Sequence, residues 1–204
     1  MNAEEKTRDA KSIVREYVES TVMAVALALF IMTFIARSFS VDGSSMVPTL
    51  HNGERVLVDE ISYRLIKPAR GEIIVFRLPA NPKVRYIKRI IGLPGDTVEI
   101  RDGRVLVNGE PLQEDYLSEP IYGDFGPYRV PEDSYFVLGD NRNNSEDSRF
   151  RRVGYVPRRY IVGRAIFRYW PLSKVGVLSP PEAFRERAAS RLGEPAGAQA
   201  GGSR

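Results

Sequence analysis

The 204-residue sequence predicts a mainly β protein, in which an antiparallel β-sheet domain follows one apolar N-terminal helix. Downstream of residue 50, short runs of alternating polar and apolar residues are separated by Gly and Pro rather than by helical segments, which is typical of antiparallel domains. Upstream, residues 21–36 contain no charged side chain. The composition, 43% hydrophobic and 27% charged, is globular and excludes a multi-span membrane protein.

The uncharged run at residues 21–36 has three interpretations: a signal peptide, a buried core helix or a transmembrane anchor. A signal peptide has a shorter apolar region followed by a small-residue cleavage site, and the residues from Arg37 onward make a poor one. A core helix normally has a polar face, which this run lacks. A spanning helix needs about 20 apolar residues, and the run can extend past a snorkelling Arg37. We therefore expect a membrane anchor over residues 21–39.

Basic residues before the run predict its orientation, because cytoplasmic flanks are enriched in Lys and Arg. We expect residues 1–20 to be cytoplasmic, residues 40–180 to form an extracytoplasmic β-rich domain, and residues 181–204 to form a short helix and a disordered tail. The protein would then be a single-pass cell-membrane protein. The basic residues are Lys6, Arg8, Lys11 and Arg15.

Alternating apolar residues predict the strands of residues 40–180 in order. In the fourth segment, Asp102-Gly103 supplies a two-residue hairpin turn. Residues 111–131 are loop-rich and predict a surface excursion. The predicted strand segments are 55–59, 72–78, 84–91, 98–107, 135–138 and 160–170.

Residue counts exclude several kinds of site. The sequence has no cysteine and a single histidine, His51. Disulfides, thiolate metal sites, cysteine nucleophiles and His-rich metal sites are therefore excluded. His51 follows an apolar residue in a polar turn, where we expect it to be exposed rather than to act as a base. The net charge of +4 fits anionic lipid headgroups, and no basic run interleaved with aromatic residues indicates a nucleic-acid partner.

The segment at residues 41–50 contains the candidate nucleophile. Gly43 and Pro48 interrupt regular structure, so Ser44 and Ser45 are expected at a strand end or turn, where a hydroxyl can be both rigid and reachable. The alternative is a turn in which the hydroxyls only bond the backbone.

Two cations, Lys88 and Arg89, lie within residues 86–91 of the predicted strand 84–91. Strand alternation places Tyr86 and Lys88 on one face, and Ile87 and Arg89 on the other, so that one charge is expected to face the core. A buried Arg89 would need a partner. A buried Lys88 would have a lowered pKa and could serve as a general base for a serine. A lysine that reaches solvent at a strand edge is the alternative.

Residues 139–149 are dense in Asp, Asn, Ser and Arg. This cluster has three interpretations: a solvated loop, a cation site, or a set of polar side chains that fixes a catalytic group. The spacing of a calcium loop is missing, because Arg142 interrupts the oxygen ligands.

In combination, these segments resemble bacterial type I signal peptidases, membrane-anchored serine proteases that use a Ser-Lys dyad. The resemblance implies a signal-peptidase-like β fold, no metal or cofactor, and two partners, the lipid bilayer and the signal peptides of exported preproteins, which are cut after Ala-x-Ala. The matching segments, in the family's order, are 43–50, 53–63, 70–76, 86–96 and 139–149.

The same resemblance implies the roles of individual residues. Ser45 is the expected nucleophile, Lys88 the general base, and Ser145 the residue that hydrogen-bonds and orients the lysine amine. Gly43 stands where some members carry a serine that completes the oxyanion hole. The expected supporting residues are Asp140, Arg142, Asp147 and Arg149, and the expected substrate-binding residues are Phe39, Val41, Met46, Leu50, Val56, Val75, Tyr86 and Ile87.

Other classes fit less well. A LexA-like repressor shares the catalytic pair but has a DNA-binding helical domain in place of the apolar run. No S-x-x-K pattern surrounds Ser45, and Val47 replaces the second glycine of a hydrolase elbow. A non-catalytic anchored β domain that binds peptides by strand addition remains the alternative on physical grounds.

Overall fold

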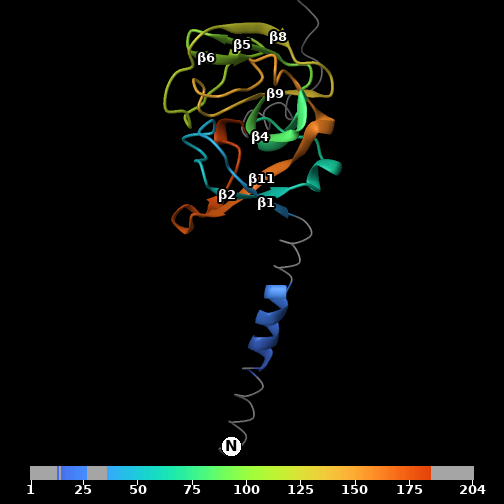
Figure 1. Ribbon diagram of the computed structural model, residues 1–204. Coiled ribbons are helices and arrows are strands. Elements are labelled where there is room, and N and C mark those ends of the chain that lie inside the picture. The colour runs from blue at the N-terminus through green and yellow to red at the C-terminus, as the bar shows by residue number, and fades with distance from the viewer. Residues whose placement is uncertain (1–12, 14, 27–35, 185–204) are drawn as a thin grey trace, which may run out of the picture. The chain divides into compact units, whose positions relative to one another are not determined.

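The computed structural model describes residue 13, residues 15–26 and residues 36–184 (Figure 1). The chain divides into two compact units, Met1–Arg37 and Ser38–Arg204. In the first unit, the described residues up to residue 26 are helical. Within the described part of the chain, no helix is long and apolar enough to cross a membrane. Residues 27–35, which include the middle of the expected anchor, lie outside this part.

The end of the expected anchor differs from the prediction. Ala36–Ser40 forms strand β1, the edge strand of the larger sheet, beside β2 (Arg55–Asp59). Phe39 packs against an apolar cluster of buried residues from the same sheet and from the segment between β1 and β2. A helix therefore does not continue to residue 39, because strand pairing and the burial of Phe39 stabilise an extended backbone there.

The larger sheet has eight strands, in the order β1-β2-β11-β3-β4-β9-β10, with β12 paired to β11. From β2 to β10 the neighbouring strands are antiparallel, which confirms the mainly β antiparallel prediction. Strand β4 lies between β3 and β9, in the interior of the sheet. The remaining bounds are β3 (Ile73–Leu78), β4 (Asn81–Gly92), β9 (Ser134–Leu138), β10 (Val156–Pro157), β11 (Ile161–Trp170) and β12 (Gly176–Val177).

A smaller, four-stranded sheet has the order β7-β6-β5-β8. Its central hairpin turns at Asp102 and Gly103, whose φ angles of 53° and 74° are those of the predicted primed turn. In Figure 1, β5, β6 and β8 lie at the end of the β domain opposite β1 and β2. The strands are β5 (Thr97–Arg101), β6 (Arg104–Val107), β7 (Glu110–Pro111) and β8 (Phe125–Arg129).

All six predicted strand segments are strands in the structure, but the loop prediction for residues 111–131 is partly wrong. Strand β8 lies within that range and pairs with β5. Gly126-Pro127 interrupts the alternation there, which hid the strand from a periodicity argument. Short 3-10 helices occur at Ser62–Arg64, Arg158–Tyr160 and Leu172–Lys174.

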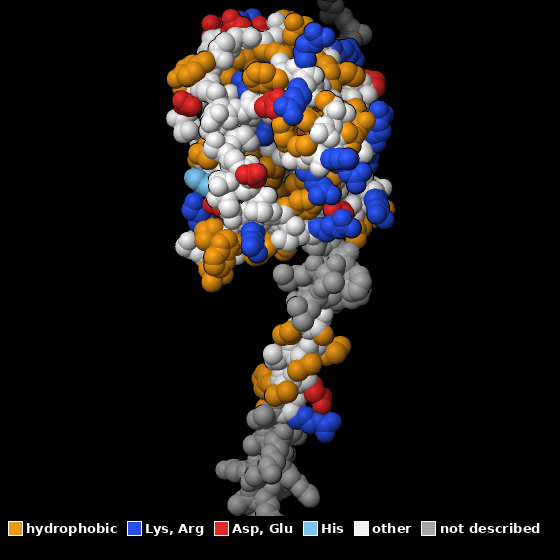
Figure 2. Space-filling view, viewed as in Figure 1, with side chains coloured by type: hydrophobic (Ala, Val, Ile, Leu, Met, Phe, Trp, Pro, Cys, Tyr) orange, Lys and Arg blue, Asp and Glu red, His pale blue; other side chains and the backbone are white. Residues whose placement is uncertain are grey.

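At the C-terminal end of the described residues, residues 182–184 are helical and Phe184 is buried in the core beneath the smaller sheet. The rest of the predicted short helix and the predicted disordered tail lie in residues 185–204, outside the described residues. Figure 2 shows one face of the molecule, on which Lys and Arg side chains gather along one side of the β domain beside apolar patches.

Candidate active site

Ser45 lies in a tight turn between β1 and β2, as predicted. The Val47 amide donates to the Ser44 carbonyl at 3.1 Å, and Gly43 has a φ of +88°, which an L side chain rarely adopts. The turn is held from a distant segment, because the Asn141 amide donates to the Ser45 carbonyl at 3.0 Å. The local sequence thus makes the turn, and residues 139–149 hold it in place.

Lys88 approaches Ser45 from the interior strand β4. Its Nζ lies 2.7 Å from the Ser45 Oγ and donates also to the Ile87 carbonyl at 3.0 Å. Only 4% of the Lys88 surface is exposed. Burial lowers the pKa of the Lys88 amine to about 8, against the opposing effect of Asp147, Asp140 and Glu146, whose negative charges favour the protonated form. A fraction of the amine is therefore neutral at physiological pH.

Arg89 is buried as well, with 2% of its surface exposed, so the prediction that only one of the two charges faces the core is wrong. Both faces are covered here because other segments pack on them: the Ser45 turn lies on Lys88, and Asp140 and Tyr116 lie against Arg89. Arg89 has the partner that burial requires: its Nε and Nη2 donate to the two carboxylate oxygens of Asp140 at 2.8 and 2.6 Å. Its Nη1 donates to the Gly71 carbonyl at 2.8 Å.

Residues 139–149 form a polar network with a buried centre, in which Asp140, Arg142 and Asp147 are buried, whereas Asn143 and Asn144 are exposed. Arg142, 1% exposed, makes a bidentate ion pair with Glu114 at 2.6 and 2.7 Å. Arg149 donates to Asp147 at 2.8 and 2.9 Å, and Asp147 in turn accepts the Gly139 amide at 3.1 Å. The four expected supporting residues are therefore all engaged in ion pairs. Sequence reasoning missed Glu114, which lies in the predicted excursion and carried no signal of its own.

Ser145 does not make the hydrogen bond expected with the Lys88 amine. Its Oγ is buried and has no hydrogen-bond partner among the residues that the structure describes. The hydroxyl packs against Gly139, where an added Cβ would lie 2.2 Å from the Ser145 Oγ and 2.4 Å from the Ser45 carbonyl oxygen. Glycine at position 139 is thus required for the close approach of the loop to the Ser45 turn.

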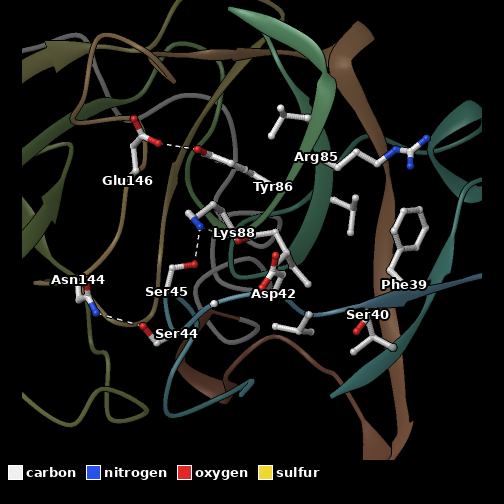
Figure 3. A pocket seen from close by; sticks show the side chains of 16 residues that line it. Phe39, Ser40, Asp42, Ser44, Ser45, Arg85, Tyr86, Lys88, Asn144 and Glu146 are labelled. Atoms are coloured by element: carbon white, nitrogen blue, oxygen red, sulfur yellow. Dashed lines mark hydrogen bonds between the residues drawn. The ribbon is translucent and has the colours of Figure 1, made fainter. Parts of the chain in front are cut away.

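A cavity of about 420 Å³ opens beside Ser45 and Lys88 (Figure 3). Its lining includes six of the eight expected substrate-binding residues: Phe39, Val41, Val56, Val75, Tyr86 and Ile87. The other two, Met46 and Leu50, do not line it; they are 1% and 0% exposed and belong to the apolar core below.

The cavity lining also includes four residues with charged or amide side chains that the sequence interpretation had not assigned to it: Asp42, Arg85, Asn144 and Glu146. Asn144 donates from Nδ2 to the Ser44 Oγ at 3.1 Å, and Glu146 accepts a hydrogen bond from the Tyr86 hydroxyl at 2.5 Å (Figure 3). Asn144 and Glu146 belong to the polar cluster at 139–149, but nothing in their spacing distinguished them from solvated side chains.

The remaining candidates have simpler surroundings. Gly43 lines the cavity and donates its amide to the Asn52 Oδ1 at 2.9 Å, so position 43 supplies no hydroxyl to the site. The His51 side chain is 45% exposed, lies 3.5 Å from Glu54, and is not part of the cavity lining. Among the described residues, no group of three or more His, Asp or Glu side chains is placed to hold a metal ion.

Comparisons with known proteins agree with this site. The sequence matches the family described as "Signal peptidase, peptidase S26" over residues 14–170. It is 47% identical over 182 residues to signal peptidase I of Leptolyngbya laminosa, covering 86% of this chain and 89% of the relative. It is 41% identical over 176 residues to signal peptidase I S of Bacillus subtilis, covering 81% and 94%. A crystal structure of a signal peptidase I from Enterococcus faecalis is 42% identical, with a TM-score of 0.44, and is matched over 48% of this chain and 97% of that chain.

A serine hydroxyl bonded to the amine of a buried lysine is the arrangement of serine hydrolases that replace the histidine of a triad with lysine. The sequence matches, which cover most of the chain, identify one family within that class of hydrolases. This chain belongs to the signal peptidase family, peptidase S26. Its activity is that of a signal peptidase I, a serine peptidase that cleaves signal peptides, and membership implies association with a membrane.

Proposed function

We propose that the protein is a membrane-bound serine endopeptidase that removes signal peptides after small residues of the Ala-x-Ala type, with Ser45 as nucleophile and Lys88 as general base. The observation that carries the proposal is the 2.7 Å contact between the Lys88 Nζ and the Ser45 Oγ. This distance is within reach for direct proton transfer from the hydroxyl to the amine.

In the first half of the reaction, the neutral Lys88 amine accepts the Ser45 proton while the Ser45 Oγ attacks the carbonyl carbon before the cut. The tetrahedral intermediate collapses to an acyl-enzyme, and the new amino terminus leaves with a proton from Lys88. Burial supports this role because it lowers the pKa of Lys88 and so maintains a neutral fraction of the amine.

In the second half, a water that loses its proton to Lys88 hydrolyses the acyl-enzyme and releases the signal peptide. The Ser45 backbone N–H is the proposed oxyanion donor, as the resemblance implies. Ser145 remains a proposed positioning residue, although it does not contact the amine through any hydrogen bond in the structure. A buried hydroxyl without a partner costs free energy, and the Lys88 amine is the partner that the mechanism makes available once Ser45 is acylated.

The cavity supports selection of small side chains. Its walls next to the dyad are mostly apolar, from Val41, Val56, Val75 and Ile87, and its volume of about 420 Å³ has to receive several substrate residues. Apolar pockets of limited size discriminate against larger side chains through steric exclusion. Binding in this cavity brings the peptide bond to Ser45, which lines it.

The proposed topology is a single membrane span with the N-terminus in the cytoplasm and the catalytic domain on the extracytoplasmic side. Residues 1–20 are the cytoplasmic segment, the uncharged run that begins at residue 21 is the anchor and ends before β1, residues 40–180 are the catalytic domain, and residues 181–204 are a tail. Contact of the domain with lipid is supported by exposed apolar side chains near β12: Trp170, Leu172, Val175 and Val177.

The test compares wild type, Ser45→Ala and Lys88→Ala, purified in detergent, on a precursor with Ala-x-Ala before the junction. We expect wild type alone to cut after the final alanine, with rate losses of about 10³-fold or more in both variants. Mass spectrometry of the products gives the site of cleavage. Cleavage by all three proteins would show that the active site lies elsewhere. If none of them cuts the precursor, the result would favour a non-catalytic, membrane-anchored domain that binds peptides.

The pH profile adds a second criterion. Because the amine has to be neutral, kcat/KM is expected to fall as pH drops through the pKa of Lys88, which is about 8. A profile that stays flat down to pH 5 excludes Lys88 as the base.

A further inference from the structure

One contact at the cavity has no place in the mechanism so far. The Tyr86 hydroxyl, on β4, donates to the Glu146 Oε2 at 2.5 Å. Both residues line the cavity, and their bond connects the strand that carries Lys88 to the loop that carries Ser145 (Figure 3). The short distance to a carboxylate is that of a charge-assisted hydrogen bond, which is stronger than a bond between neutral groups.

This bond holds an aromatic ring against the catalytic base. The Lys88 Nζ lies 5.2 Å from the centroid of the Tyr86 ring, and the ring also packs edge-on against Phe76, with 6.2 Å between the centroids. The hydroxyl is the polar end of an otherwise apolar wall. With that end bound to Glu146, the ring has a fixed orientation in the lining of the cavity.

Glu146 also differs from the other acidic residues around Lys88 in the partner that it has. Asp140 is bound by the buried Arg89, and Asp147 by Arg149. The basic partner of Glu146 is Arg152, at 3.5 Å, whose side chain is 58% exposed. The charge of Glu146 is therefore the least neutralised of the three. The remaining charged groups lining the same cavity are Asp42 and Arg85.

We propose that Glu146 is a positioning and specificity residue for the Ser45–Lys88 site: its hydrogen bond fixes the Tyr86 ring as the wall that selects small substrate side chains, and its negative charge, in the cavity that Lys88 also lines, favours the protonated amine. This inference rests on the proposed function and deepens it. It separates two contributions of one carboxylate, the hydrogen bond and the charge, and the chain offers variants that remove each alone.

Tyr86→Phe removes the hydrogen bond and leaves the charge, whereas Glu146→Gln removes the charge and leaves an oxygen that can accept from Tyr86. The first readout is the ratio of kcat/KM for two precursors that differ only in alanine or valine before the cut. In Tyr86→Phe we expect this ratio to fall by about 3- to 10-fold, the worth of one hydrogen bond. In Glu146→Gln it stays within about twofold of wild type.

The second readout is the midpoint of the acid limb of kcat/KM. Removal of a nearby negative charge favours the neutral amine, so in Glu146→Gln we expect the midpoint to move to lower pH by about 0.2 to 0.7 units, the size expected for a partly exposed charge. Arg152→Gln removes the cation beside Glu146 and should move the midpoint upward. In Tyr86→Phe the midpoint stays in place. A high-salt series reduces both shifts, because salt screens exposed charges.

An unchanged Ala-to-Val ratio in Tyr86→Phe would contradict the proposal that the fixed Tyr86 ring selects small side chains. An unshifted acid limb in Glu146→Gln would contradict the proposed effect of the Glu146 charge on Lys88. Equal losses in both variants at every pH, with matching losses of thermal stability, would mean that the bond only holds the fold together. Failure of the proposed function is distinct from these outcomes, because wild type would then not cut the alanine precursor, or Ser45→Ala would cut it equally well.

Discussion

The two sheets of the β domain have cores of opposite character. Beneath the smaller sheet, the buried side chains are apolar, with Val98 and Val105 at 0% exposure and Ile100 at 2%. On the larger sheet, around the Ser45 turn, the buried residues include five charged side chains: Lys88, Arg89, Asp140, Arg142 and Asp147.

The difference shows where this fold accepts an energetic cost. Four of the five buried charges have a partner of opposite sign, since Arg89 binds Asp140, Arg142 binds Glu114 and Arg149 binds Asp147. Lys88 instead donates to two neutral oxygens, the Ser45 hydroxyl and the Ile87 carbonyl. A buried ionised group without a partner shifts its pKa toward the neutral form. Among these five described side chains, the proposed chemistry is thus placed at Lys88, for which the structure gives no ion pair.

The largest effect is expected from breaking a buried ion pair at the site. Asp140→Ala leaves Arg89 buried and uncompensated, which should lower the free energy of unfolding by about 3 to 5 kcal/mol and reduce cleavage activity as well. Urea denaturation and kcat/KM measure the two effects. The control is Asp124→Ala, at an exposed position. A loss below about 1 kcal/mol, the range of surface pairs, would contradict the role given to this pair.

In the smaller sheet, Ile100→Ala should destabilise the protein by about 2 to 4 kcal/mol through the cavity that it creates. Because the smaller sheet is distinct from the site, we expect stability to fall without a loss of activity: well below the melting temperature, kcat/KM per folded molecule stays at the wild-type value. Calorimetry and precursor cleavage on the same samples check this. If activity falls together with stability, the smaller sheet influences the site more than its apolar core indicates.

Lys88→Met should stabilise the protein while abolishing cleavage. The pKa of Lys88 falls from an ordinary value of 10.5 to about 8 on folding, so below pH 8 the folded state carries the full cost of a buried ammonium, up to about 3 kcal/mol. Between pH 8 and 10.5 the cost disappears, because the amine becomes neutral in the unfolded state too. The stability gain of the variant, measured by denaturation at several pH values, should shrink over that window. A gain that persists at pH 11 would have another origin.

The smallest effect is expected where Glu114 and Tyr116, which follow strand β7, contact Arg142 in the segment 139–149. The Tyr116 hydroxyl donates to Glu114 at 2.7 Å and accepts from Arg142 at 3.0 Å. Tyr116→Phe removes both bonds and should cost about 1 to 2 kcal/mol in stability, with a smaller loss of kcat than Asp140→Ala. Tyr128→Phe, whose residue is 56% exposed, is the matched control. Equal effects of the two variants would show that Tyr116 does not support the segment 139–149.

Local pattern was sufficient for most strands and for the Ser45 turn. Alternation of apolar residues depends only on neighbours along the chain, and Asp102-Gly103 and Gly43 require backbone angles that few other residues adopt. The same argument failed at β8, where Gly126-Pro127 hides the alternation, and at residues 36–39, where pairing with β2 decides between helix and strand.

By itself, the sequence determined the class of fold, the candidate serine and lysine, and the family to which they belong, because these depend on residue types and their order. Only the tertiary structure decided that Lys88 and Arg89 are both buried, since segments distant in the sequence pack on each face of β4, with Ser45 on Lys88 and Asp140 on Arg89. It also decided that Glu114 pairs with Arg142 and Glu146 with Tyr86. Such partners lie 28 and 60 residues apart in the chain, and only folding brings them within hydrogen-bond distance.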